Sequence, residues 1–266
     1  MDKVWTIFRK EWFEITQQRA LILTMVLPPL LFALVPLIAI WGTGVIPPGE
    51  IDDLNDLKDV FVKLYPAMAQ MNEREVVQTI TGQQLSVLFL LMPVILPSVI
   101  ASYSVVGEKT SQTLEPLLAT PVETWELLLA KGLSSLIPSV GLTWLSALLY
   151  VPGVFLASQS ALVVQTLISP GWILAVLLWG PLLSLITILL TLAISSRAND
   201  PRTAQQVSVV TILPVMGLFM GQMFGVLSVS PAVVLVGAAL LAVIAAICLW
   251  ITVRLFQRET ILTRWS

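Results

Sequence analysis

The sequence predicts an all-α integral membrane protein with six transmembrane helices, an N-terminal amphipathic interfacial helix and a short cytoplasmic helix between spans 2 and 3. The first observation is composition, because 57% of the 266 residues are hydrophobic and only 11% are charged. A soluble domain would carry roughly 25% charged residues. The second is that charges gather in a few segments that separate six apolar blocks. Each block is close to the ~20 residues that a helix needs to cross a bilayer. Residues 1–266 therefore form one transmembrane domain.

Residues 3–19 precede the first apolar block and have the pattern of an amphipathic helix. Five apolar side chains recur at helical spacing and form one stripe: Val4, Ile7, Phe8, Trp12 and Ile15. A helix with Trp and Phe on one side and basic residues on the other is typical of the membrane interface. An ordinary soluble helix would show the same periodicity, but the hydrophobic span that begins at once favours the interfacial helix.

The six apolar blocks are interpreted as transmembrane helices. They cover residues 21–41, 83–104, 132–156, 172–194, 207–227 and 231–253. Proline lacks a backbone N–H and clashes with the carbonyl four residues before it, so prolines bend or break a helix. Pro28, Pro29 and Pro36 predict a bent or locally unwound first span. A break in the second span is predicted at Pro93 and Pro97.

The loop between the first two spans, residues 42–80, is acidic, and its charge indicates the orientation of the chain. It holds seven acidic residues but only three of the 14 Lys and Arg residues. The other 11 basic residues lie at the two termini and in the 105–131 and 195–206 loops, which six spans place on the opposite side. Because Lys and Arg are enriched in cytoplasmic loops, both termini are predicted to be cytoplasmic and the 42–80 loop extracellular. Its apolar residues at helical spacing predict one or two interfacial helices.

Residues 107–131 interrupt the apolar sequence between the second and third spans. Six charged residues lie in this segment: Glu108, Lys109, Glu115, Glu123, Glu126 and Lys131. Charges are costly at bilayer depth, so the segment is predicted to be a cytoplasmic loop. Leu114, Leu117 and Leu118 fall on one side of a short helix. That half-apolar helix predicts a docking surface.

The sequence Thr120-Pro121-Val122-Glu123 has the form of a helix N-terminus. Thr120 suits the N-cap, Pro121 the first helical position and Glu123 the third, as in a capping box. A helix is therefore predicted to begin at Pro121 and to continue into the third span. The alternative is a passive connector on the inner leaflet, which the glutamates disfavour because they would face anionic headgroups.

Residue usage narrows the class of function. The chain has no histidine and one cysteine, Cys248, so no metal site and no histidine-based catalysis is predicted. No basic stripe indicates nucleic acid binding. Gly107-Glu108-Lys109-Thr110 lacks the upstream glycine of a phosphate-binding loop, so this chain is not expected to bind ATP itself. A secondary transporter would need ionisable residues near the midplane, and a membrane enzyme would need a nucleophile with a base. Neither pattern occurs, while a non-transporting membrane scaffold stays open.

The loop carries a family resemblance. Glu108-Lys109, followed by Thr113-Leu114-Glu115-Pro116-Leu117-Leu118-Ala119-Thr120-Pro121-Val122, resembles the cytoplasmic motif of ABC-2 type transporter permeases, the membrane subunits of type V ABC exporters. The resemblance implies that this segment is the coupling helix, which contacts a separate cytoplasmic ABC ATP-binding subunit. The residues it assigns to that contact are Glu108, Lys109, Thr113, Leu114, Glu115, Leu117, Leu118, Thr120 and Pro121.

The same resemblance implies the rest of the assembly. Residues 3–19 would be the connecting helix beside the coupling helix. A second permease subunit, identical or different, would complete a dimer in a prokaryotic cell membrane, with both termini cytoplasmic. ATP and Mg²⁺ would be bound by the ATP-binding subunit, and this chain would bind no cofactor and be no enzyme.

If the chain is an exporter subunit, the fifth apolar block is the polar, methionine-bearing candidate for the substrate path at the dimer interface. The residues concerned are Ser208, Thr211, Met216, Met220 and Gln222. Flexible methionine side chains suit varied apolar ligands. The alternative, that these residues only pack the spans together, stays equally open.

Overall fold

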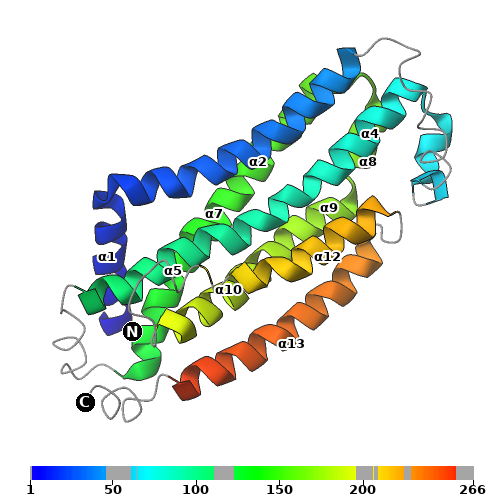
Figure 1. Ribbon diagram of the computed structural model, residues 1–266. Helices are drawn as coiled ribbons and strands as arrows, with labels where there is room; N and C mark the ends of the chain where they lie inside the picture. Colours follow the sequence, from blue (N-terminus) through cyan, green and yellow to red (C-terminus); the bar gives the residue numbers. More distant parts are fainter. Residues whose placement is uncertain are drawn as a thin grey trace.

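The fold is a bundle of long helices that run back and forth along one axis (Figure 1). The computed structural model describes residues 2–45, 61–63, 65–110, 123–195, 206, 209–224 and 229–255, and the regular structure within them is entirely helical. The elements are α1 (Asp2–Gln17), α2 (Arg19–Val45), η2 (Pro66–Gln70), α4 (Glu73–Ser86), η3 (Val87–Leu91), α5 (Met92–Thr110), α7 (Thr124–Ala157), α8 (Ala161–Leu167), α9 (Pro170–Leu174), η4 (Ala175–Trp179), α10 (Gly180–Ser195), η5 (Val209–Thr211), α12 (Ile212–Met223) and α13 (Pro231–Leu255).

Five helical stretches in the described part of the chain are long and apolar enough to cross a membrane. They are Arg19–Thr43, Glu73–Ser104, Trp125–Ala157, Ala161–Ser195 and Pro231–Arg254. In the fifth predicted span, residues 207–227, the described residues contain only the shorter apolar helix α12 and a 3₁₀ turn before it, and α12 at 12 residues is about 18 Å long. Bilayer hydrocarbon is about 30 Å thick. The multi-pass membrane class is thus confirmed, and the count of six spans stays a prediction.

The prolines break some helices and leave others intact. Of the two alternatives predicted for the first span, α2 excludes local unwinding, because it runs without interruption through Pro28, Pro29 and Pro36, and the bend stays a prediction. This helix packs along α4 and α7, so tertiary contacts outweigh the local preference. The two breaks predicted in the second span fare differently. The break at Pro93 agrees with the 3₁₀ segment η3, which ends two residues before it, whereas the break at Pro97 is wrong, because Pro97 lies inside the continuous helix α5. A π-helical segment, η4, similarly precedes Gly180 and Pro181.

The predicted outer loop is shorter than residues 42–80. Helix α2 continues to Val45 and α4 begins at Glu73, because Asn72 caps the new helix. The Asn72 side chain accepts from the Glu75 N–H at 3.0 Å, and the Glu75 carboxylate accepts from the Asn72 N–H at 2.8 Å. Between the two helices, Phe61, Met68 and Met71 form a small apolar cluster with Val76 of α4.

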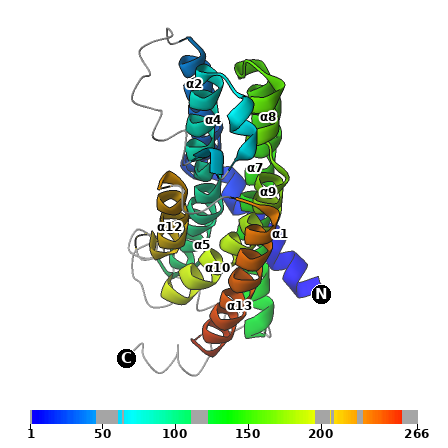
Figure 2. The same cartoon turned by 90° about the vertical axis from the view of Figure 1, so that its right-hand side faces the viewer.

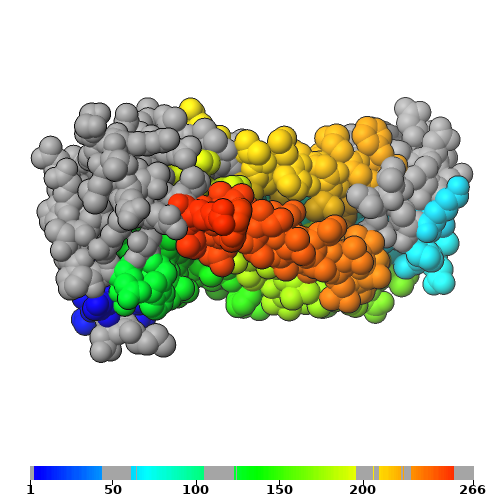
Figure 3. Space-filling model, turned by 90° about the horizontal axis from the view of Figure 1, so that it is seen from below, coloured from blue at the N-terminus to red at the C-terminus, as the bar shows by residue number. Residues whose placement is uncertain are grey.

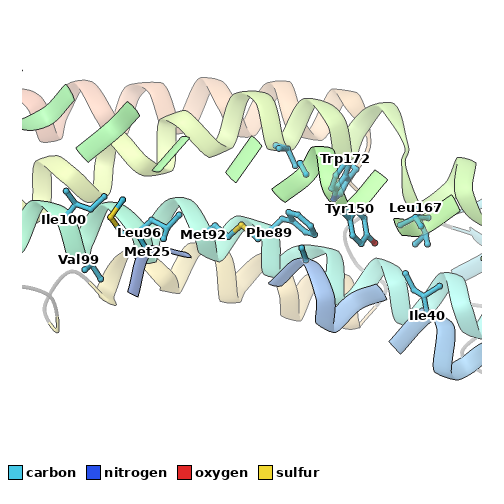
Figure 4. Packing of buried hydrophobic residues seen from close by; sticks show 14 of the residues in the cluster. Met25, Ile40, Phe89, Met92, Leu96, Val99, Ile100, Tyr150, Leu167 and Trp172 are labelled. Carbon is cyan, nitrogen blue, oxygen red and sulfur yellow. The ribbon is translucent and has the colours of Figure 1, made fainter. Parts of the chain in front are cut away.

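The core lies where α2, η3–α5, α7 and α9 meet (Figure 4). Phe89, Tyr150 and Trp172 come from three different parts of the chain and stack on one another with ring centroids 4.8–5.5 Å apart. Such tilted and edge-on pairs add to the burial of three large rings. The stretch through α4, η3 and α5 is the central one, with 78% of its apolar window buried, whereas only 17% is buried in α13. Figure 3 shows α13 along one outer face, beside α12.

Helix α13 is held to the bundle by a close approach at Trp179. The indole N–H donates to the Val234 carbonyl at 2.8 Å, and its ring lies against Gly237, where a Cβ would meet ring atoms. Gly237 thus allows the aromatic ring of η4 to lie flush on α13.

Replacing Trp179 by Phe is expected to lower the free energy of unfolding by about 1 kcal/mol, because one interhelical hydrogen bond is lost. Thermal unfolding of the detergent-solubilised protein measures the change. Trp250→Phe is the matched control, since Trp250 lies on α13 itself and is 57% exposed. Equal losses of stability in Trp179→Phe and Trp250→Phe would contradict a stabilising role of the hydrogen bond from Trp179 to Val234.

Helix α1 leaves the bundle axis at a steep angle (Figures 1 and 2). It lies at the same end of the bundle as the last turns of α13, the end of α5 and the start of α7, while the end of α2 and the start of α4 lie at the other end. The elements that flank residues 107–131 are therefore gathered around α1.

Candidate functional site

The motif segment, residues 108–122, is flanked by helices α5 and α7 of the bundle. Helix α5 ends at Thr110 and α7 begins at Thr124, and the two pack against each other. Glu108 and Lys109 lie in the last turn of α5, and their side chains are outside the described part of the structure. The other predicted contact residues, Thr113, Leu114, Glu115, Leu117, Leu118, Thr120 and Pro121, lie outside the described residues.

Helix α7 begins three residues later than predicted. Its N-cap is Glu123, whose backbone is extended (φ −75°, ψ 149°), so the predicted helix does not run unbroken from Pro121 into the third span; Thr120 and Pro121 themselves lie outside the described residues. The N–H of Glu123 donates to the Glu126 carboxylate at 2.9 Å, and the Glu123 side chain accepts from the Glu126 N–H. Trp125 also donates its indole N–H to the Glu123 carboxylate. Two carboxylates at a helix N-terminus favourably face the positive end of the helix dipole.

Helix α1 packs on the first turns of α7 through a small apolar cluster. Val4 and Ile7 contact Leu127 and Ala130, and all four are buried. A weaker contact at the rim joins Lys3 to Glu126, with 4.0 Å between nitrogen and oxygen. The predicted stripe on α1 is thus only partly right. Its Val4, Ile7 and Ile15 are buried, but Trp12 is 40% exposed and stacks with Phe8 in a second, aromatic row.

A buried ion pair lies directly behind this cluster. The Lys131 ammonium of α7 donates to Oε1 of Glu11 on α1 at 2.8 Å, and the two side chains are 1% and 3% exposed. Lys131 also donates to the carbonyl and to the hydroxyl of Ser104 on α5, at 2.8 and 3.0 Å. The Ser104 hydroxyl in turn donates to the second oxygen of Glu11 at 2.6 Å. We call Glu11, Ser104 and Lys131 the three-helix clamp.

Sequence reasoning missed the clamp, although a signal for half of it was present. Glu11 continues the spacing of Val4, Ile7 and Ile15, so it lies on the side of α1 that faces the protein. An acid inside an apolar stripe requires a buried partner. Which base it pairs with could not be derived, because Lys131 is 120 residues away.

The predicted path residues do not share one face of α12. Thr211 and Gln222 are buried against the bundle, at 5% and 4% exposure, whereas Met220 is 44% exposed on the opposite side. Met216 is half-buried and Ser208 lies outside the described residues. The structure therefore separates an inner polar pair from an outer apolar face.

The buried end of α12 approaches the outer loop at Tyr65. The Tyr65 hydroxyl donates to the Gln83 side chain of α4 at 3.4 Å, and Gln83 donates to the Thr166 carbonyl at 2.7 Å. Burial raises the pKa of the Tyr65 phenol, and the nearby Gln222 side chain and Val229 backbone lower it in part. The Gln222 amide thus lies near Tyr65, but its two buried polar atoms have no hydrogen-bond partner among the described residues.

Buried hydroxyls along α7 bond within their own helix. Ser135, Ser139 and Thr143 each donate to the carbonyl four residues before them, at 2.7–3.2 Å. Ser134 and Ser146 also donate to carbonyls of α7. Small hydroxyl residues of this kind allow membrane helices to approach closely.

Comparison with known protein families identifies the chain. The family described as ABC-2 family transporter protein matches residues 5–233, which include α1, the three-helix clamp, the motif segment and α12. No curated protein matches the chain closely enough to count as a relative. Because the match covers most of the sequence and the described residues form apolar spanning helices, the chain is a multi-pass transmembrane subunit that belongs to the ABC-2 family of transporter permeases.

Proposed function

We propose that this chain is the permease subunit of an ATP-driven exporter, in which two permease chains form the translocation path at their interface and couple to separate ATP-binding subunits. The observation that carries the proposal is the family match over residues 5–233, which includes the Glu108–Pro121 motif. Both termini and the motif would face the cytoplasm of a prokaryote, as the distribution of Lys and Arg predicts. The ATP-binding subunit would supply the ATP and Mg²⁺ sites.

The mechanism follows from how residues 111–122 are attached. Binding of ATP brings the two ATP-binding subunits together, and each subunit moves the coupling segment, residues 111–122, that contacts it. Leu114, Leu117 and Leu118 would give the apolar contact, and the nearby charges of Glu108, Lys109 and Glu115 would fix its orientation. Because α5 and α7 are continuous helices from this segment into the bundle, a displacement at their ends moves the spans as rigid bodies.

The exposed side of α12 is the part of the predicted path that a second copy could meet. Leu213 and Met220 are 66% and 44% exposed, whereas Thr211 and Gln222 face the bundle. The two inward residues would reach a substrate only after the helices shift relative to one another. Ion coupling is less well supported, because the buried charges of Glu11 and Lys131 lie near the end of the helices and are already paired.

Co-expression with candidate ATP-binding subunits tests the proposal. We expect one of them to co-purify in equal amount with the chain, and its vanadate-sensitive ATP hydrolysis to differ from that of the same subunit alone. Reconstitution in lipid nanodiscs gives the comparison. A chain that is purified in folded form but changes the hydrolysis rate of no such subunit would contradict the proposal.

A further inference from the structure

The three-helix clamp joins the helix that enters the coupling segment, the helix that leaves it and the N-terminal helix. Glu11 belongs to α1, Ser104 to α5 and Lys131 to α7. The clamp is closed, since Lys131 contacts both partners and Ser104 contacts Glu11 directly. Movement of any one of the three helices relative to the others must break at least one of these bonds.

The clamp joins α5 and α7 at nearly the same distance from the coupling segment, residues 111–122. Ser104 is six residues before the end of α5 at Thr110, and Lys131 is seven residues after the start of α7 at Thr124. At 1.5 Å per residue, the stretch of helix between the clamp and the coupling segment is about 10 Å long in both α5 and α7. The end of α5, the start of α7 and α1 therefore form one short rigid unit between the coupling segment and the spans.

Stability alone is a weak reason for a charged pair at this place. Taking two charges out of water costs several kcal/mol, and replacing a buried ion pair by apolar residues of similar volume is often neutral or stabilising. The pair supplies direction instead: the ammonium has three donors, and Glu11 Oε1, the Ser104 carbonyl and the Ser104 hydroxyl define three directions for them. An apolar contact of the same volume would let the helices slide.

We propose that Glu11 and Lys131 are positioning residues for energy coupling: through Ser104 they lock α1, α5 and α7 together, so that a displacement of the coupling segment reaches the spans undiminished. The inference rests on the proposed function. It predicts that charge and geometry at the clamp matter for transmission more than for folding.

The test measures transmission without needing to know the cargo. Phe224→Cys places a thiol at the C-cap of α12, where the native side chain is 70% exposed, at the end of the bundle opposite α1. The chain's only cysteine, Cys248, is changed to alanine in the same background. Maleimide labelling of the complex with its ATP-binding subunit is measured in nanodiscs, with and without ATP and vanadate. We expect labelling rates that differ several-fold between the two conditions.

The variant Glu11→Leu with Lys131→Met is expected to co-purify with the ATP-binding subunit and to hydrolyse ATP, but to label at equal rates in both conditions. Lys131→Arg keeps the positive charge and the hydrogen-bond donors, so it is expected to show part of the difference in labelling rate between the two conditions. This single variant keeps the proposal testable if the double variant misfolds. Glu14→Leu, an acid-to-leucine change at a solvent-facing position of α1, is the matched control and keeps the full difference.

The outcomes separate the two proposals. A full several-fold difference in the double variant overturns the clamp assignment and leaves the exporter assignment standing. So does a Lys131→Arg protein that is folded and labels no differently from the double variant. Equal rates in the unmodified background, with ATP hydrolysis intact, overturn the exporter mechanism and the clamp together.

Discussion

Replacing Glu115 by Arg together with Leu118 by Asp is expected to abolish co-purification with the ATP-binding subunit and every permease-dependent change in its hydrolysis rate. Leu118 lies on the apolar side of the predicted coupling helix, and an aspartate there would be desolvated without a partner. Reversing the charge at Glu115 would place like charges opposite any basic groove that receives it. Losses of this kind cost 2–5 kcal/mol or more at an interface, which is at least about thirtyfold in affinity.

A matched change on the other side of the membrane makes this result specific. Asp52→Arg with Leu54→Asp repeats the same chemistry in the 42–80 loop, which the orientation places outside the cell. We expect this control to co-purify like the unmodified chain. Retention of binding by the Glu115 and Leu118 variant, or loss of binding by the control alone, would show that the ATP-binding subunit docks elsewhere or that the orientation is reversed.

Replacing Gly171 by Ala is expected to have the largest effect on folding among the glycine positions that the structure describes. Gly171 lies in the first turn of α9, and a Cβ there would overlap the carbonyl oxygen of Val229 and crowd the Ser230 backbone, just before α13. Backbone atoms cannot rotate away as a side chain can, so α13 must shift. The loss of stability should reach about 3 kcal/mol, the upper end for overpacking.

Thermal unfolding of the solubilised protein, followed by the fraction that stays monodisperse, measures this loss. Gly141→Ala is the control: Gly141 lies within α7, and a Cβ added there meets no atom within 4 Å. In an open helical position alanine is favoured over glycine by roughly 0.5–1 kcal/mol. The two substitutions should therefore shift the melting temperature in opposite directions, and a Gly171→Ala protein as stable as the unmodified chain would contradict the close contact.

The local sequence was sufficient to predict those features that depend on a single segment of the chain. Hydropathy and the grouping of charges predicted the membrane class, and the 3₁₀ segment before Pro93 followed from proline chemistry. It failed where two chemically plausible caps compete. Thr120 is a usual N-cap residue, but α7 begins after Glu123, whose capping depends on Glu126 three residues further on and on Trp125 beside it. In α2 the three prolines allow either a bend or local unwinding, and packing along the helix keeps it unbroken.

The sequence by itself determined that the chain is helical, that it lies in a membrane, and that residues 107–131 form a charged break carrying a permease motif. These are properties of composition and of short windows, in which the solvent or lipid acts on each segment separately. Only the tertiary structure decided that Glu11 meets Lys131, and that Gln222 of α12 is buried whereas Met220 of the same helix is exposed. The physical reason is that a buried charge needs a partner, but spacing along one helix fixes only the side it faces, and packing selects which distant residue is there.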